Sequence, residues 1–505
     1  MAARRALVLT PRRAEARAVS GGAPGLEAIV TGLGPERSRR SAINLAARCQ
    51  GAPAVAVAGV CRAGGPAVCP GDVVVATEVR GPLGPVPVPA APLVAAALAR
   101  AGLRVHQGPL LSLGVESAAR TDVDPDPEGA GALAVDNETA WLVEAAAARP
   151  LAVVQVVVDE ADDRAGDTGS ATTLPGGLRT YRALRRTARE LAAWAAAVAP
   201  RTVLMAEPRS FCAGVERAIE VVERALDRYG PPVYVRRQII HNRHVVADLE
   251  SRGAVFVDEV DEAPMGARLV FSAHGVSPAV EAEAERRDQT VIDATCPLVA
   301  KVHREVRRFA ARDYSVVLVG HADHDEIEGT MGELADIRLV STPEEAATVD
   351  LPDPDRAAYV TQTTLALDDV AEVVDVLRER FPALVGPAAD DVCYATQNRQ
   401  DAVRAIAADC DVLLVAGSQN SSNSNRLVEV AERAGCTAHL VDDEGDIDLA
   451  WLTGAATVGV TAGASAPPWV VDRLVAALRG LGSVDIRTRT VTAETVRFSL
   501  PEAVR

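Results

Sequence analysis

Short apolar runs alternate with longer segments of helical pattern through residues 1–163, and this alternation predicts an α/β sheet. The apolar runs are ALVLT, AIVTGLG, AVAVAGV, DVVVATEV and LAVVQVVVD, each of a length typical of a strand. Between them the pattern predicts helices that begin at Glu15 and that cover 38–50 and 91–102. These residues are therefore expected to form a first α/β domain.

A polar break and a long helix separate this region from a second one of the same kind. Gly, Ser and Thr dominate 165–178, as in a loop or linker, and an Arg/Ala/Leu-rich helix is expected over 179–198, before Pro200. Apolar strands and helical segments then alternate again from TVLMAEP to about residue 497. We therefore expect a first domain over 1–164, a linker and helix over 165–200, and a second α/β domain over 201–497.

The second region contains a weak internal repeat, in which an apolar strand leads into a turn with one cysteine and then into a helical pattern. The repeats are TVLMAEPRSFCAGVERAIEVVERAL, TVIDATCPLVAKVHREVRRFA and DDVCYATQNRQDAVRAIAADC, and they contain Cys212, Cys296 and Cys393. Repeats of this length predict three small α/β lobes around a shared centre. A cysteine that begins a helix faces free N–H groups and the positive end of the helix dipole. We therefore expect its thiolate, the form that binds metals, to be favoured.

Three thiolates from three lobes can converge only on something central. Zinc sites usually draw on local Cys-x2-Cys pairs, which this region lacks. An iron–sulfur cluster accepts ligands from distant segments, and three cysteines on a four-iron cluster leave one iron open, as in a catalytic metal site. Cys410 and Cys436, at helix-to-strand junctions, are expected to be small buried residues. From spacing alone, three buried thiols without a metal remain an equal alternative.

Most of the histidines gather in one stretch of the chain. Six of the eight lie in polar segments that contain glycine or follow strands, namely His241, His244, His274, His303, His321 and His324. Imidazoles at such places suit anion binding or proton transfer. If the segment after His324 is extended, His324 and Glu326 share one face and reach the same pocket, and Glu328 would share that face too.

Two later loops are rich in small hydroxyl and amide side chains. GSQNSSNSNRL follows the strand DVLLVAG and precedes a helix expected from Asn425 to Ala434, and VTAGASAPPW repeats the arrangement with Ser465. A strand–turn–helix unit of this kind directs N–H groups and the helix dipole at an anion. Two such loops together with several histidines predict a diphosphate site, whereas an ordinary polar turn is the alternative for either loop alone.

Composition narrows the class of protein. The chain has 505 residues and a net charge of −17, which argues against nucleic acid as the main partner, as does an aromatic content of 3%. No membrane span is expected because no apolar run is long enough, and the N-terminus is typical of a first strand and not of a signal peptide. Because the cysteines are scattered, as in a reducing compartment, we expect a cytoplasmic protein.

A single lysine, Lys301, stands among 52 basic residues, and all the others are arginine. It follows Cys296 within the same repeat. In a chain that otherwise uses arginine, this lysine indicates either a position that arginine does not fit or a chance survivor. The two interpretations stay open at the level of the sequence.

Together these segments resemble the 4-hydroxy-3-methylbut-2-enyl diphosphate reductases, iron–sulfur enzymes of the non-mevalonate isoprenoid pathway. The matching segments run in family order over roughly residues 202–480: PRSFCAGVERAI, HNRHVV, SAHGVS, DATCPLVAKVH, GHADHDEIEGTMG, YVTQTTL, DDVCYATQNRQ, GSQNSSNSNRL and GVTAGASAP. Ser210, where glycine is common, and Gln397, where threonine is frequent, depart from the family pattern. Neither departure lies at a position with an implied role.

The resemblance implies a fold and a role for each matching residue. The implied fold is a reductase of three pseudo-repeated α/β lobes around a central [4Fe-4S] cluster, with Cys212, Cys296 and Cys393 as its ligands. Glu326, His324 and Thr363 are the implied catalytic residues, with Glu326 in proton delivery and the other two beside the substrate. Diphosphate contacts are implied for His241, His274, Ser421, Ser422, Asn423 and Ser465.

The implied reaction is a reductive dehydroxylation of the allylic diphosphate. The open iron receives the substrate alcohol, two electrons enter through the cluster, and Glu326 helps the oxygen leave as water. Protonation at either of two carbons then gives isopentenyl or dimethylallyl diphosphate. Ferredoxin or flavodoxin is the implied electron donor, and a cluster-containing sensor without turnover is the alternative. A helix with several arginines is either a docking patch for such an acidic donor or a solvated face: Arg304, Arg307, Arg308 and Arg312.

Residues 5–195 resemble the nucleoside phosphorylase and nucleosidase superfamily through ALVLTPRRAEARAV, VTGLGPERSRRSA, GVCRAGGPAVCPGDVVVATEV, AVDNETAWL and VVQVVVDEAD. The resemblance implies that Glu138 holds a ribose and that Asp159 protonates a leaving base. Asn137 replaces the methionine that usually precedes that glutamate, which favours a degenerate or regulatory domain. The Gly-x-Gly at 32–34 is compatible with a turn around an anion. A bifunctional enzyme with an active N-terminal half is the alternative.

Overall fold

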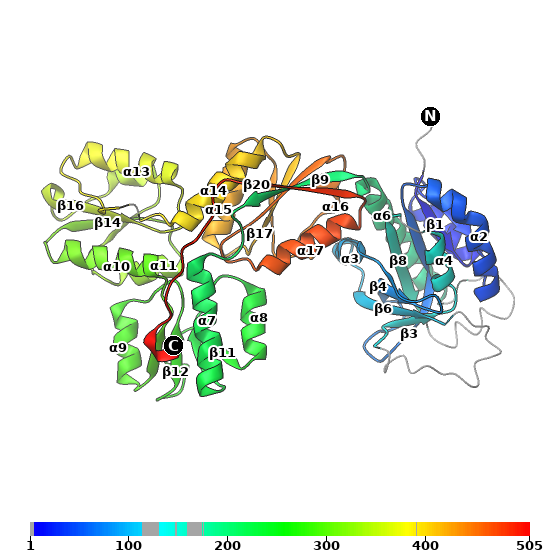
Figure 1. The fold of residues 1–505 in the computed structure, drawn as a ribbon, viewed down its shortest axis with the longest axis horizontal. Helices are drawn as coiled ribbons and strands as arrows, with labels where there is room; N and C mark the ends of the chain where they lie inside the picture. Colours follow the sequence, from blue (N-terminus) through cyan, green and yellow to red (C-terminus); the bar gives the residue numbers. More distant parts are fainter. Residues whose placement is uncertain (1–4, 114–130, 147–148, 159–173, 175, 390) are drawn as a thin grey trace. The chain divides into compact units, whose positions relative to one another are not determined.

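The computed structural model describes residues 5–113, 131–146, 149–158, 174, 176–389 and 391–505. This part of the chain divides into two compact units. The colours of Figure 1 follow the residue number from the N-terminus to the C-terminus. No helix in the described ranges is long and apolar enough to cross a membrane. The N-terminal unit comprises Met1–Val203, Asp443–Val458 and Asp472–Ile486, and the second unit comprises Leu204–Asp442, Gly459–Val471 and Arg487–Arg505.

A mixed sheet lies at the centre of the N-terminal unit, in the order β2-β1-β3-β7-β6-β4-β5, and β8 pairs with both β3 and β4. The pairings therefore close into a ring of five strands, β3, β7, β6, β4 and β8. Every residue of β8 is buried, including Gln155 within its otherwise apolar run. The strands are β1 Leu7–Thr10, β2 Glu27–Val30, β3 Val55–Ala63, β4 Val73–Arg80, β5 Val86–Pro87, β6 Val105–Ser112, β7 Ala134–Asp136 and β8 Leu151–Val157.

The helices of the N-terminal unit follow the predicted pattern with small shifts at their ends. The helix expected over 38–50 begins earlier, because Pro35 occupies the first turn, where its fixed φ suits a helix. The helix expected over 91–102 ends at Arg100, and the one expected over 179–198 spans 177–197. The described helices are α1 Arg13–Gly22, α2 Pro35–Gly51, α3 Ala91–Arg100, α4 Thr139–Ala145, α6 Gly177–Ala197 and α16 Leu449–Leu452.

Three separate sheets follow the N-terminal sheet along the chain, which confirms the prediction of three α/β lobes. The first lobe contains a parallel sheet, β11-β10-β12-β13, and the second a parallel sheet, β15-β14-β16. The third contains the five strands β18-β17-β19-β9-β20. The strands are β9 Arg201–Glu207, β10 Val233–Arg236, β11 Ala254–Val257, β12 Arg268–Phe271, β13 Thr290–Asp293, β14 Ser315–Val319, β15 Arg338–Val340, β16 Ala357–Thr361, β17 Val412–Ala416, β18 Ala438–Val441, β19 Thr457–Ala462 and β20 Val484–Thr490.

Amphipathic helices cover these sheets and build a hydrophobic core in each lobe. In the first lobe α7 packs on β10, in the second α10 packs on β14 and β16, and in the third α14 packs on β9 and β17. Figure 1 shows each sheet beside its helices. The helices are α7 Ala213–Tyr229, α8 Arg243–Ser251, α9 Pro278–Arg286, α10 Pro297–Ala310, α11 Asp325–Met331, α12 Pro343–Thr348, α13 Leu367–Arg380, α14 Tyr394–Ala407, α15 Ser422–Arg433 and α17 Pro468–Arg479.

Three of the crossings between lobes each contain a cysteine of the repeat, whereas the segment after β20, which returns to the core of the first lobe at Leu500 and Val504, contains none. The chain leaves β9 of the third lobe and enters α7 of the first at Cys212. It then leaves β13 of the first lobe and enters α10 of the second at Cys296. It enters α14 of the third lobe at Cys393, where the expected strand is wrong, because the described residues just before that helix are irregular. Crossings between lobes lie near the centre, so the topology itself draws the cysteines together.

Candidate functional site

The three repeat cysteines occupy equivalent positions in their lobes. Cys212, Cys296 and Cys393 are the N-cap residues of α7, α10 and α14, so each sulfur lies beside the free N–H groups of a first helical turn. All eight cysteines of the chain are free thiols. The three N-cap cysteines line one cavity of about 100 Å³. The convergence expected from the repeat is therefore present.

A glycine keeps the space between two of these sulfurs open. A Cβ atom placed on Gly214 would lie 2.7 Å from Sγ of Cys296 and 3.8 Å from Sγ of Cys212. The first distance is far below a normal contact, so any larger residue would displace the sulfur of Cys296. Free thiols from three lobes around a cavity that a side chain would fill fit an iron–sulfur cluster, whose ligands come from distant segments.

Burial opposes the thiolate form that the helix N-termini were expected to favour. It raises the pKa of Cys296 to about 12 and the pKa of Cys393 to about 11, and in both cases the neighbouring cysteines add to the rise. The N–H groups of the first helical turns lower both pKa values, but by less. The expectation of ready thiolates is therefore wrong for these two residues. A metal bound by these thiols would release their protons, and its positive charge would offset the cost of that loss.

Cys410 and Cys436 lie away from this cavity, in the core of the third lobe. Cys436 is buried among the side chains of α14, α15 and β17, with Cys410 packed against the same cluster. The Cys436 thiol donates to the backbone oxygen of Cys410 over 3.7 Å. Cys436 is buried as expected, whereas Cys410 is only partly buried.

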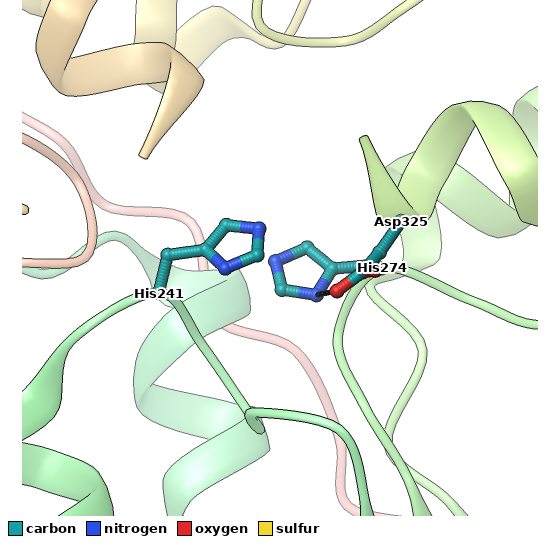
Figure 2. Close-up of side chains that lie close together, drawn as sticks. All are labelled: His241, His274 and Asp325. Atoms are coloured by element: carbon teal, nitrogen blue, oxygen red, sulfur yellow. Dashed lines mark ion pairs between the residues drawn. The ribbon is translucent and has the colours of Figure 1, made fainter. Parts of the chain in front are cut away.

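Three of the six clustered histidines meet at the cavity. The rings of His241 and His274 stack with centroids 4.1 Å apart, and His324 lies edge-on to both, at 5.2 and 5.7 Å. Figure 2 shows the facing rings of His241 and His274, with Asp325 beside Nδ1 of His274 at 3.7 Å. Ligand atoms of His241, His274 and Asp325 lie within 4.8 Å of one another, close enough to share a small ligand or ion.

Burial favours the neutral form of these imidazoles. It lowers the pKa of His241, lowers that of His274 well below the usual value, and lowers that of His324 to about 4. Nε2 of His241 is buried and has no hydrogen-bond partner among the described residues. An anion in the cavity would supply that partner and would raise all three pKa values, because it favours the charged imidazolium.

The other three histidines do not line the cavity. His244 packs edge-on against Trp469, and His303 is buried with Nδ1 2.8 Å from Glu333. Nε2 of His321 lies 3.0 Å from the Arg426 guanidinium. These histidines therefore have structural partners, and the candidate site keeps His241, His274 and His324.

Glu326 lies buried at the floor of the cavity, held by one threonine. The backbone N–H of Thr363 donates to Oε1 over 2.7 Å, and the Thr363 hydroxyl donates to Oε2 over 2.9 Å. Burial raises the pKa of Glu326 to about 7, although both hydrogen bonds lower it. The raised pKa favours the protonated carboxyl group near neutral pH, as a general acid requires.

The segment from His324 is helical and not extended. His324 is the N-cap of α11 and its Nδ1 accepts the N–H of Glu326 over 3.1 Å, so both side chains turn to the cavity from one cap. The expectation that Glu328 shares this face is wrong. Its side chain is 54% exposed and pairs with Arg236 and Arg237.

The two polar loops meet across the cavity. Oγ of Ser421 lies 3.0 Å from Oγ of Ser465, and Nδ2 of Asn423 donates to Ser421 over 2.7 Å. The N–H of Ala464 donates to Oδ1 of Asn423 over 2.6 Å, which ties one loop to the other. The helix after the first loop begins at Ser422, three residues before the expected Asn425, so the loop's own side chains lie in its first turn. This is the strand–turn–helix geometry of an anion site.

Two hydroxyls of the cavity were not among the expected site residues. The Thr364 hydroxyl lies 2.9 Å from the Ser422 hydroxyl and connects β16 to the polar loop. Thr396 lines the cavity from the first turn of α14. In the sequence, Thr364 could have been found from the Thr-Thr pair after an apolar strand, and Thr396 from its hydroxyl one turn beyond Cys393.

In the N-terminal unit, Glu138 contacts the Gly-x-Gly turn at 32–34, which the sequence indicated as compatible with an anion site. The N–H of Gly34 donates to Oε1 of Glu138 over 2.9 Å, and Gly32 and Gly34 both have positive φ. Burial, and then the nearby Asp136, raise the pKa of Glu138 to about 7. The carboxyl group thus takes the donor that an anion would use. Asp159 lies outside the described residues.

The expected patch of arginines is only partly on α10, because Arg312 lies beyond the end of this helix at Ala310, and it is partly neutralised. Arg307 lies 3.5 Å from Glu333, and Arg308 pairs with Glu305 on the same helix. Arg304 is exposed. This helix face therefore has less net positive charge than its sequence indicates.

In a comparison with known protein families, residues 203–479 match the family model described as LytB protein. A relative in Mycobacterium bovis, 4-hydroxy-3-methylbut-2-enyl diphosphate reductase 2, is 57% identical over 309 residues, which are 60% of this chain and 94% of the relative. The reductase of Bordetella pertussis is 55% identical over 303 residues, 60% of this chain and 93% of the relative.

Solved structures give the same correspondence for the three lobes. The E-1-hydroxy-2-methyl-but-2-enyl-4-diphosphate reductase from Plasmodium falciparum aligns with a TM-score of 0.58 and 34% identity, over 61% of this chain and 97% of its own. The chain is also similar to a 5'-methylthioadenosine/S-adenosylhomocysteine nucleosidase from Helicobacter pylori, at 15% identity and a TM-score of 0.30. This second alignment covers 38% of this chain and 97% of that one.

Proposed function

The chain belongs to the LytB protein family, and from this premise we propose that it reduces 4-hydroxy-3-methylbut-2-enyl diphosphate to isopentenyl and dimethylallyl diphosphate. One observation supports this function above all. A single cavity gathers three free thiols from three lobes, a buried protonatable carboxyl group and a ring of anion-binding groups. A redox centre, a proton donor and a diphosphate anchor are the parts that a reductive dehydroxylation needs.

Cys212, Cys296 and Cys393 would hold the iron–sulfur cluster. When bound, a [4Fe-4S] cluster with three protein ligands supplies electrons and a Lewis-acidic iron with an open coordination position. Gly214 keeps the space beside two of the sulfurs free, and the open cavity around the thiols supports the assignment. Ferredoxin or flavodoxin is the proposed electron donor, and we propose a cytoplasmic location.

The diphosphate would lie between the histidines and the polar loops. His241 and His274 present imidazole N–H groups from the first lobe, while Ser421, Asn423 and Ser465 present hydroxyl and amide groups from the third. Ser422 completes the loop from the first turn of α15. Anchoring the diphosphate on two lobes fixes the allylic end toward the cysteines, and this orientation lowers the entropic part of the barrier.

Glu326 would deliver the proton that lets the hydroxyl group leave as water. Thr363 holds both carboxyl oxygens, so the acid has one orientation, and burial keeps about half of these groups protonated near pH 7. His324 caps the same helix and faces the cavity, where a proton taken up on diphosphate binding would lie beside the substrate. The protein thus supplies the acid, its orientation and the shelter from water.

We propose domain bounds of 1–164 and 201–497, joined by 165–200, and a degenerate or regulatory role for the first domain. The Glu138 carboxyl group accepts a hydrogen bond from the N–H of Gly34. This contact supports a degenerate or regulatory role over nucleoside cleavage. Incubation of the full chain with nucleosides, with and without phosphate, tests it. Release of free base at rates above the uncatalysed reaction would instead establish a bifunctional enzyme.

An anaerobic turnover assay tests the reductase function. The purified full chain, reconstituted with iron and sulfide, is mixed with the substrate diphosphate and a one-electron reductant, and the products are separated by chromatography. Both isomeric diphosphates are expected, with one oxidised reductant pair per product. A chain that holds its cluster but forms neither product would refute the proposed function.

A further inference from the structure

The only lysine of the chain joins two cysteine-bearing segments. Lys301 lies on α10, the helix that begins at Cys296, and its ammonium group donates to the backbone oxygen of Ala389 over 2.7 Å and to Oδ1 of Asp391 over 3.1 Å. Both acceptors precede Cys393. Asp391 is fully buried and also accepts the N–H of Thr361 over 3.2 Å. The compact ammonium group has three donors, enough to bind this carbonyl and this carboxylate at once.

An arginine makes the equivalent contact one lobe earlier. Arg217 lies on α7, the helix that begins at Cys212. Its Nη1 donates to the backbone oxygens of Ala294 and Thr295 over 3.1 and 3.0 Å, and these two residues directly precede Cys296. One guanidinium nitrogen therefore binds two successive carbonyls.

A second arginine makes the contact one lobe later. Arg399 lies on α14, the helix that begins at Cys393, and its side chain is 1% exposed. It donates to the backbone oxygen of Ser210 over 2.7 and 3.0 Å and to that of Phe211 over 3.2 Å, directly before Cys212. Glu494 balances its charge at 3.0 Å.

These three contacts form a closed ring around the cavity. The helix begun by each cysteine carries a cation that binds the end of the same lobe, in the segment just before the next cysteine. Arg217 binds the end of the first lobe, Lys301 that of the second and Arg399 that of the third. We propose that Arg217, Lys301 and Arg399 are positioning residues, which hold the three sulfurs in register for the cluster. This inference rests on the proposed function, because it assumes that the sulfurs bind a cluster.

The ring explains how each cysteine keeps a fixed position where the chain passes from one lobe to the next. Each contact holds the segment that leaves a lobe against the first helix of that lobe, so the following cysteine starts from a fixed point. Hydrogen bonds to a charged group contribute roughly twice as much as neutral ones, so the ring resists movement of these segments. The segment before Cys393 is also connected to Glu326. The N–H of Cys393 donates to the backbone oxygen of Thr363 over 2.8 Å, and Thr363 in turn binds the Glu326 carboxyl group.

Cluster release from the reconstituted full chain tests the ring. Lys301→Met removes the ammonium group, and Arg304→Gln is the matched control, since it removes one exposed charge from the same helix. Lys301→Arg is the conservative variant. Iron and sulfide contents, the electron paramagnetic resonance spectrum of the reduced cluster, the rate of iron release to a chelator and the melting temperature without cluster are measured for each chain.

We expect Lys301→Met to release iron about tenfold faster than the wild-type chain, which corresponds to one charged hydrogen bond. Its resonance spectrum should broaden, as the sulfurs lose their single arrangement. Lys301→Arg should fall between the two, and Arg304→Gln should behave as wild type. Wild-type release and spectrum in Lys301→Met and Lys301→Arg, or equal acceleration by Arg304→Gln, would overturn the ring. A wild-type chain that takes up no iron and sulfide would overturn the proposed function together with it.

Discussion

Replacement of Glu326 by glutamine tests the proton role of its carboxyl group while keeping its shape. Glutamine can still accept the N–H of Thr363 with its amide oxygen, so the hydrogen bond that positions the side chain remains. The change removes the one proton that the acid could give. It also removes the charge that the buried carboxyl group bears above neutral pH.

The structure sets the size of both effects. Burial raises the pKa of Glu326 from 4.5 to about 7, which corresponds to about 3 kcal/mol at 1.36 kcal/mol per unit. At pH 7 about half of the carboxyl groups are protonated, against fewer than about one in a hundred without the shift. Loss of a positioned general acid lowers turnover by about 10²- to 10⁴-fold, so Glu326→Gln should lose most activity.

The raised pKa also predicts the sign of a stability effect in the chain without cluster. Between pH 4.5 and 7 the folded chain binds a proton at Glu326 that the unfolded chain has lost, so wild-type stability falls as pH rises through about 7. Glu326→Gln lacks this titration. Its advantage in unfolding free energy over wild type should therefore grow from pH 5 to pH 8, up to about 3 kcal/mol.

Turnover with a one-electron reductant, iron content and denaturant unfolding measure these effects. Glu328→Gln is the matched control, because it lies on the same helix with an exposed side chain outside the cavity. Wild-type activity should decline above pH 7, and the Glu328→Gln control should follow the same profile. Glu326→Gln with an intact cluster and wild-type turnover, or an equal loss in Glu328→Gln, would refute the proton role.

Three further changes test other parts of the site. Cys296→Ser should lose the cluster absorbance and most bound iron, whereas Cys436→Ser should retain both, and full iron in the first variant would exclude that ligand. Because burial lowers the pKa of His324 to about 4, binding of inorganic diphosphate should take up protons at pH 7, which calorimetry in buffers of different ionisation heat detects; an uptake unchanged in His324→Gln would contradict this. Ser210 has φ of 62°, so Ser210→Gly should raise the unfolding free energy by up to about 1 kcal/mol, and a lower melting temperature would contradict the strain.

The sequence predicts the larger features of the fold because its patterns are local. Apolar runs and helical periods identify most strands and helices, and the repeat around the cysteines indicates three lobes before any contact is known. The same repeat places each thiol at a helix start. It does not predict their protonation, because burial by other lobes outweighs the helix N-terminus at Cys296 and Cys393.

The remaining features depend on contacts between distant segments. Reading His324 to Glu328 as extended fails, because a histidine cap starts a helix there and turns Glu328 toward Arg236 and Arg237. The sequence also could not decide whether Lys301 occupies a position that arginine does not fit or is a chance survivor. The residues that accept its hydrogen bonds lie almost a full lobe later in the chain. Such pairings have no period along the chain, and only the folded structure defines them.

The central claim is that three cysteines hold a four-iron cluster with one iron left for the substrate, and Mössbauer spectroscopy tests it most directly. The full chain is reconstituted anaerobically with ⁵⁷Fe, and spectra are recorded before and after addition of the substrate diphosphate. We predict one iron with parameters distinct from the other three, and a change at that iron alone when substrate binds. Four equivalent irons, or spectra that the substrate leaves unchanged, would contradict the account.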